Sequence, residues 1–302
     1  MPTLRQMEYW LAAVEEGSFG RAARRMHVSQ PSLSQQVKVL EAELGGELCE
    51  RLPDGVRLTP AGREFLPHAR DAVDASRRAV RTVRAALDLK GGELEIATVR
   101  SIAVGILPDL VNAWRRRFPA ASVRLREFTH RRLAEEAVAK GVADMGIGPP
   151  PPGWRGPVHR LGWEELVVIL PADDGDVDSA PIRLDSLRDR DWVMFDADNG
   201  MSDLIAGACL TAADPFTPRP AVYTSQVETA TRLAAAGVGP TLVPANVVPA
   251  GLRGRALPCL PAVGRELAVY GRAEFSPQAA AFLELMSEVE WEQPPGGAVV
   301  IG

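Results

Sequence analysis

A long helical pattern, running from Thr59 to about Leu89, is the feature that most constrains how this chain of 302 residues folds. Thr59 can cap a helix that has Pro60 at its first position, and Gly91-Gly92 stops the pattern. A chain of this length also exceeds the size at which one hydrophobic core keeps growing, so at least two domains are expected. The sequence therefore predicts an N-terminal domain at residues 1–60, a connecting helix at 61–90 and a C-terminal domain at 91–302.

The connecting helix carries apolar and small residues at alternating steps of three and four, which is the spacing of a heptad seam. These residues are Leu66, Ala69, Val73, Ser76, Val80, Val83 and Leu87. Because the opposite faces carry Arg and Asp, pairing with another helix is favoured narrowly over covering a domain. We expect a dimer through this helix, with a kink near its start at Pro67.

Three short helices are indicated before this run by apolar residues at helical spacing. Ser18 can cap the second, Ser29 can cap the third, and Gly45-Gly46 ends the third. Its expected buried stripe is Leu33, Val37, Leu40 and Leu44. Its other side and N-terminal end carry polar groups that can reach base edges or phosphates in a major groove: Gln30, Ser32, Ser34, Gln35 and Lys38. Taken alone, this could equally be an amphipathic helix with a solvated face.

A predicted hairpin favours the DNA-binding interpretation. Residues 49–51 and 56–58 flank Leu52-Pro53-Asp54-Gly55, which is typical of a tight turn, and the strands place Arg51 and Arg57 beside the third helix. Three helices and a basic hairpin make a winged helix-turn-helix. The charge distribution is consistent with DNA binding by the N-terminal part only: residues 1–90 carry 14 Lys and Arg against 12 Asp and Glu, a small positive excess, whereas the remainder carries 20 against 27.

The C-terminal domain alternates short apolar runs with amphipathic helices, which indicates α/β units around a mostly parallel sheet. Expected strands are Leu94–Thr98, Val123–Glu127, Asp144–Ile147, Leu166–Leu170, Trp192–Phe195, Arg219–Tyr223, Thr241–Val243 and Arg265–Tyr270. Expected helices are Ser101–Phe118, Arg131–Lys140, Ser202–Ala213, Ser225–Ala236 and Pro277–Glu290, followed by a tail. The order predicts two Rossmann-like lobes joined by two crossovers, lobe I at about 91–163 and 266–290 and lobe II at about 164–265.

Ligands in such sheets gather outside the carboxyl ends of the strands. Four loops have that position: Arg100-Ser101, Thr129-His130, Asp196–Met201 and Ser225–Val227. Ser101, Thr129 and Ser225 could instead be helix caps. Arg100 would favour an anionic ligand, whereas Asp196, Asp198 and Glu228 argue the other way, so the charge of the ligand stays open.

Other classes of function receive little support. The four histidines are dispersed, and no nucleophile elbow, phosphate loop or His-Glu-x-x-His run is present, so an enzyme is not expected. Neither a cofactor nor a metal site is expected, and Cys49, Cys209 and Cys259 are interpreted as buried, reduced thiols. The start of the sequence has no secretory signal, which favours the cytoplasm. A free solute-binding protein would leave the winged helix unexplained.

The sequence resembles the LysR-type transcriptional regulators. The resemblance is carried, in family order, by residues 13–19, 21–23, 28–34, 40–45 and 58–62, and continues through 92–94, 107–108, 117–119, 144–148 and 237–239. Two departures are Gln35, where many members have Arg, and Cys49, where Phe is usual. Members that sense peroxide pair two cysteines in the second lobe, but Gly200 stands where the partner of Cys209 would fall.

The resemblance implies specific partners and contact residues. Promoter DNA would be read by a recognition helix led by Gln30 and Pro31, with Ser32, Ser34, Gln35 and Lys38 as further candidates and Arg51 and Arg57 in the wing. A small-molecule inducer or co-repressor would lie between the lobes against Ser101, Thr129, Asn199 and Gln226, with Ile147 near the floor and Arg100 at the mouth. The family also implies a dimer or tetramer that binds a palindrome-like site and contacts RNA polymerase.

Overall fold

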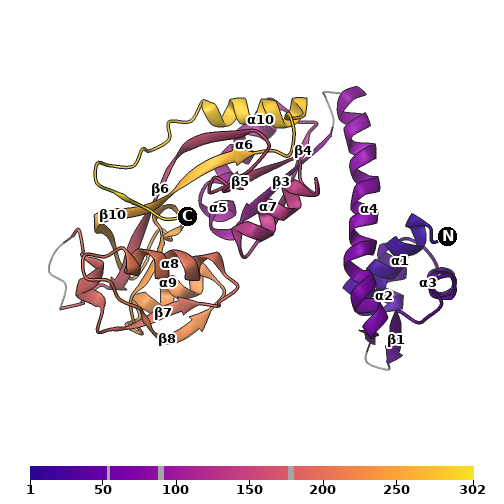
Figure 1. The fold of residues 1–302 in the computed structure, drawn as a ribbon, viewed down its shortest axis with the longest axis horizontal. Helices are drawn as coiled ribbons and strands as arrows, with labels where there is room; N and C mark the ends of the chain where they lie inside the picture. The colour runs from indigo at the N-terminus through magenta and orange to yellow at the C-terminus, as the bar shows by residue number, and fades with distance from the viewer. Residues whose placement is uncertain (53–54, 88–91, 176–179) are drawn as a thin grey trace. The chain divides into compact units, whose positions relative to one another are not determined.

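The computed structural model describes residues 1–52, 55–87, 92–175 and 180–302; the side chains of residues 51, 78 and 81–87 lie outside this description. The chain forms two compact units, Met1–Arg84 and Ala85–Gly302. The first contains the helices α1 Leu4–Glu15, α2 Phe19–Arg25 and α3 Gln30–Leu44, all but the last three residues of α4 Pro60–Leu87, and the antiparallel strands β1 Cys49–Leu52 and β2 Gly55–Leu58 (Figure 1).

The helix boundaries of the first unit follow from local chemistry. The Ser18 and Ser29 side chains accept hydrogen bonds from backbone N–H groups at the starts of α2 and α3, as predicted. Gly45 ends α3 with a φ of 79°, a left-handed conformation that glycine adopts without steric cost. Thr59 Oγ1 accepts from the Gly62 amide at 3.0 Å and so caps α4, which continues through Pro67.

The core of the first unit joins α4 to the three short helices. Leu33, Val37 and Leu40 are fully buried, whereas Leu44 is 41% exposed, so its place in the predicted stripe was wrong; it is the last residue of α3, where the chain turns away at Gly45. Ala69 and Val73 are also buried in this core. The first half of the predicted seam therefore packs against the three short helices, while Val80, further along α4, is 49% exposed. Val83 and Leu87 have side chains outside the described residues.

Gly62 shows how tightly the start of α4 is packed. A Cβ on this residue would lie 1.9 Å from the backbone oxygen of Leu48. Because backbone cannot move aside as a flexible side chain can, this position requires glycine.

The second unit consists of two lobes that share two long antiparallel strands, β6 Val158–Pro171 and β10 Gly254–Tyr270 (Figure 1). Lobe I adds β3 Glu93–Val99, α5 Arg100–Gly105, α6 Leu107–Arg117, β4 Ser122–Phe128, α7 Arg131–Ala139, β5 Met145–Gly148 and α10 Pro277–Ser287. Lobe II adds η1 Leu184–Leu187, β7 Asp191–Phe195, α8 Gly200–Leu210, β8 Arg219–Thr224, α9 Val227–Ala235, β9 Thr241–Pro244 and η2 Ala245–Val247. The larger sheet has the order β4-β3-β5-β10-β6-β9, β7 pairs with β8, and β11 Val299–Val300 pairs with β10.

Three elements differ from the sequence-based prediction. The helix expected at Ser101–Phe118 is two helices, because Pro108 has no N–H with which to continue the backbone ladder past Ile106. The strands expected at Leu166–Leu170 and Arg265–Tyr270 are only parts of β6 and β10. The start of β6 is exposed, and β10 has a register shift after Pro258, so neither full strand has a continuous apolar pattern.

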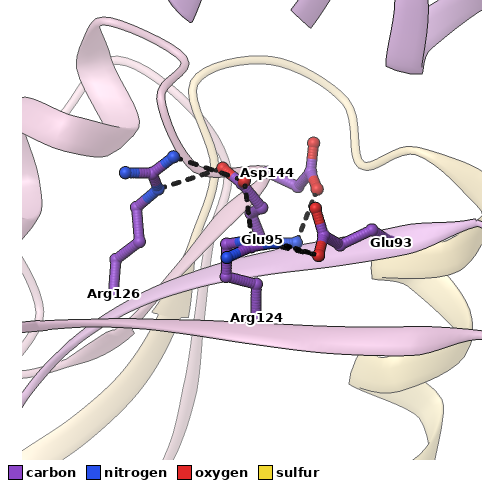
Figure 2. Close-up of polar contacts among 5 residues, drawn as sticks. All are labelled: Glu93, Glu95, Arg124, Arg126 and Asp144. Carbon is purple, nitrogen blue, oxygen red and sulfur yellow. Dashed lines mark hydrogen bonds and ion pairs between the residues drawn. The ribbon is translucent and has the colours of Figure 1, made fainter. Parts of the chain in front are cut away.

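A cluster of ion pairs joins the strands at the edge of lobe I. Figure 2 shows Arg124 and Arg126 of β4 reaching across to Glu93 and Glu95 of β3. Glu95 is 2% exposed, and its backbone N–H donates to Asp144 Oδ2 at 2.8 Å, just before β5. The hydrogen bond to Glu93 raises the pKa of Arg124. These charges hold β3 and β4 together and protect an edge strand from pairing with another sheet.

Candidate nucleic-acid interface and ligand cavity

The outer side of α3 carries the predicted base-reading residues. Gln30, Pro31, Ser32, Gln35 and Lys38 are exposed, and Ser34 is half-buried. Since the opposite side of the helix is fixed in the core, these polar groups share one exposed surface, as a helix that enters a major groove requires.

The hairpin places Arg57 of β2 directly opposite Glu50 of β1. Their side chains form an ion pair with 3.3 Å between Arg57 Nε and Glu50 Oε2, and they are 63% and 50% exposed, respectively. The guanidinium is therefore accessible but already paired with a carboxylate. The side chain of Arg51, the other predicted wing contact, lies outside the described residues.

A cavity of about 690 Å³ lies between the lobes of the second unit. Five predicted contact residues line it: Arg100, Ser101, Thr129, Asn199 and Gln226. The four loops identified at strand ends thus converge on one site. Ile147, predicted near the floor, is not among the residues that line this cavity; it is 1% exposed and packed in the core of lobe I. Its strand, β5, is buried along its whole length.

Ser101 is held by a buried polar chain that sequence reasoning missed. Arg265 of β10 donates from Nη2 to Ser101 Oγ at 2.8 Å and from Nε to Glu164 Oε2 of β6. Asn246 Nδ2 donates to Glu164 Oε1 at 2.8 Å. Because a guanidinium has only donors, Ser101 must accept this bond, which leaves its hydroxyl hydrogen free to donate elsewhere. No local motif marks these contacts, since Arg265 follows Ser101 by 164 positions.

The two lobes also contact each other across the cavity. His130, the N-cap of α7, accepts from the Arg132 amide through Nδ1, and its Nε2 lies 3.0 Å from Asp203 Oδ2 of α8. In this arrangement the ring proton is on Nε2 and points at the carboxylate. The amide of Gly200 donates to the Thr129 carbonyl at 2.9 Å. These hydrogen bonds connect lobe I to lobe II at the mouth of the cavity.

Among the predicted contact residues, only Asn199 caps a helix through a side-chain hydrogen bond. The N-cap positions of α5, α7 and α9 are Val99, His130 and Gln226, so the alternative role of Ser101, Thr129 and Ser225 as caps was wrong. Asn199 does cap α8: Oδ1 accepts from the Met201 amide at 3.0 Å, and Nδ2 donates to the Ser225 carbonyl at 3.1 Å. Both of its polar atoms are therefore engaged: Oδ1 caps the helix that follows its own loop, and Nδ2 joins that loop to the loop at Ser225.

Comparisons with known proteins agree over both units. The LysR substrate binding domain matches residues 88–291, and the bacterial regulatory helix-turn-helix protein, lysR family, matches residues 4–63. The regulator TfdS of Cupriavidus pinatubonensis is 34% identical over 250 residues, covering 80% of this chain and 82% of that protein. ClcR of Pseudomonas putida is 33% identical over 247 residues, covering 80% and 83%.

This chain belongs to the LysR family of transcriptional regulators.

Solved structures of LysR regulators have the same architecture. CbnR is 26% identical, with a TM-score of 0.68 over 95% of this chain and 98% of that chain. The complex of full-length CbnR with its target DNA has a TM-score of 0.73, over 95% and 99%. The winged helix-turn-helix followed by a two-lobed α/β domain is thus the LysR fold, as predicted. The chain is a DNA-binding transcriptional regulator with an effector-binding domain, not an enzyme.

The cysteines of this LysR regulator are not placed as reactive thiols. Cys49, Cys209 and Cys259 are buried. Burial raises the pKa of Cys209 to about 12, and burial with a smaller contribution from Glu165 raises the pKa of Cys259 to about 12. A thiol must ionise to react with an oxidant, so neither is suited to redox sensing near neutral pH. Within the described residues, no helix is long and apolar enough to span a membrane, and no cluster of three metal-binding side chains occurs.

Proposed function

We propose that α3 reads promoter DNA through Gln30, Pro31, Ser32, Ser34, Gln35 and Lys38, while Arg51 and Arg57 of the hairpin contact phosphates. The observation that carries this proposal is the division of α3 into a core-fixed side and an exposed polar side. Amide side chains such as those of Gln30 and Gln35 can form paired hydrogen bonds to adenine. Arginine at the hairpin would supply charge without reading sequence.

This assignment is tested with a binding site selected from a random DNA library. Gln30→Ala should lower the ratio of specific to nonspecific affinity, whereas Arg57→Ala should weaken binding to both kinds of DNA. If Gln30→Ala leaves the ratio unchanged, the recognition-helix assignment is wrong.

We further propose that the interlobe cavity binds a small-molecule effector against Arg100, Ser101, Thr129, Asn199 and Gln226. Two observations favour an effector with an anionic acceptor group such as a carboxylate. Ser101 Oγ accepts a hydrogen bond from Arg265, so the hydroxyl hydrogen of Ser101 can donate to an acceptor on the ligand. Arg100 lines the cavity and makes no ion pair with the described residues, whereas Arg131 and Arg265, which also line it, are paired with Glu135 and Glu164.

A thermal-shift screen of aromatic acids, aliphatic acids and amino acids tests the effector site. A ligand at a hundred times its dissociation constant adds about 2.7 kcal/mol of stability. The shift should shrink in Ser101→Ala, measured against the melting temperature of that variant alone, and persist in Ser122→Ala, which changes an exposed serine of the same lobe. An equal shift in both variants would place the ligand elsewhere.

The proposed mechanism is a shift between two lobe arrangements. A ligand that contacts Ser101 in lobe I and Gln226 in lobe II favours one angle between the lobes. The His130–Asp203 pair and the Gly200–Thr129 backbone bond at the mouth are contacts that form or break as this angle changes. In a dimer paired through the exposed end of α4, where Val80 lies, this change would respace two DNA-binding heads and alter contact with RNA polymerase. Since its target is chromosomal DNA, we place this function in the cytoplasm.

A further inference from the structure

The last residues of the chain follow a defined path along both lobes. Trp291 packs against the core of lobe I, and the Glu292 carbonyl accepts from the Trp163 amide at 2.9 Å. The segment then continues to β11 and lobe II, as the yellow end of the ribbon shows in Figure 1. The sequence predicted only an irregular tail here.

Strand β11 occupies an edge of β10 that lobe I leaves open. β5 pairs with β10 only at residues 268–270, whereas Val263 and Gly264 pair in parallel with Val299 and Val300. The Ile301 amide adds a hydrogen bond of 2.8 Å to the Gly264 carbonyl. The tail thus satisfies backbone groups of the shared strand between the lobes, where they would otherwise need water.

Ile301 brings this tail into the effector cavity. It lines the cavity and also packs against the core of lobe II. Its position is tight, since a Cβ on Gly207 of α8 would lie 2.9 Å from Ile301 Cγ2. The next residue faces lobe I, because a Cβ on Gly302 would lie 3.7 Å from Arg131 Nη1 and 3.8 Å from Pro149 Cβ.

We propose that residues 292–302 form a strap that closes one side of the effector cavity, and that Ile301 limits the size of the apolar part of the effector. This inference rests on the proposed effector site. The strap is anchored on β6 and β10, touches both lobes within two consecutive residues and offers the ligand a branched aliphatic side chain. The selection of apolar size by Ile301 is separate from the recognition of the polar group of the effector by Ser101 and Arg100.

The test uses the full chain and ligands that differ only in apolar size: benzoate and its 4-methyl, 4-ethyl and 4-propyl derivatives, and alkanoates from propanoate to octanoate. Affinities are measured by calorimetry for wild type, Ile301→Ala and Ile301→Phe. Val300→Ala is the matched control, because Val300 directly precedes Ile301 but is 53% exposed and does not line the cavity. A cavity wall altered by one or more methylene groups changes relative affinity about tenfold or more.

The expected result is that Ile301→Ala shifts preference toward longer acids and Ile301→Phe toward shorter ones, each by about tenfold, while Val300→Ala keeps the wild-type order. Unchanged preference in both Ile301 variants, with measurable binding, overturns the inference but leaves the effector site standing. Absence of binding by every probe to every variant rejects both the carboxylate site and the role of Ile301 in specificity.

A ligand-free measurement distinguishes these failures. Hydrogen exchange of the 295–302 segment should be at least about tenfold slower than in an unstructured peptide, and Gly207→Ala, which crowds Ile301 without lining the cavity, should accelerate it. Exchange at the unstructured rate in wild type would show that the strap does not form, whatever the ligand results.

Discussion

The pairing of Glu50 with Arg57 predicts that removing an acidic residue from the wing strengthens DNA binding. Arg57 must leave Glu50 to contact a phosphate, and the remaining carboxylate would repel that phosphate. Exposed ion pairs are worth about 0.2–1 kcal/mol. Abolishing that cost in Glu50→Gln should raise affinity about 1.4- to 5-fold per wing, and about 2- to 30-fold for a dimer that engages two wings.

The assay is fluorescence anisotropy with a library-selected site, repeated over a series of salt concentrations. Glu64→Gln is the matched control, since it makes the same charge change on the exposed start of α4. Arg57→Ala should reduce the slope of log affinity against log salt by about 0.9 for each phosphate that is no longer neutralised, or about 2 for a dimer. Weaker binding by Glu50→Gln, or an equal gain in Glu64→Gln, would refute the proposed role of the Glu50–Arg57 pair.

Three further predictions concern packing and ionisation. Gly62→Ala should lower the free energy of unfolding by about 1–3 kcal/mol or more, and the melting temperature of the DNA-binding unit by at least several degrees in calorimetry. Gly46→Ala is the control and should leave both unchanged, because a Cβ at Gly46 meets no neighbouring atom. Peroxide should leave DNA binding unchanged because burial raises the pKa of Cys209; an oxidant effect abolished by Cys209→Ser would contradict this. Burial and, to a smaller extent, repulsion by Glu292 raise the pKa of Glu165, so the ionised carboxylate opposes folding above that pKa. In denaturant titrations, Glu165→Gln should therefore be more stable than wild type at pH 7, and the difference should disappear as the pH falls and Glu165 is protonated.

The predictions that held rest on local chemistry. Ser18, Ser29 and Gly45 mark helix ends through bonds and dihedral angles within a few residues, so the sequence alone located them. The cavity loops were also predictable, because strand ends in a two-lobed sheet converge whatever the details of packing.

The parts of the site that the sequence could not locate depend on contacts between distant parts of the chain. Ile147 lies in a strand near the cavity, but burial on the lobe I core, not strand position, decides where its side chain points. Arg265 and Ile301 reach the site only through the pairing of β10 with β6 and β11. No pattern around either residue records that pairing.

The most direct test of the account is a DNase I footprint of the library-selected site, with and without a ligand found in the thermal-shift screen. We predict protection of a palindrome-like site by wild type and by Ser101→Ala, and a ligand-dependent change in the footprint in wild type that is reduced in Ser101→Ala. No protected site would contradict the DNA-binding assignment of α3. An identical ligand response in both proteins would contradict control from the interlobe cavity.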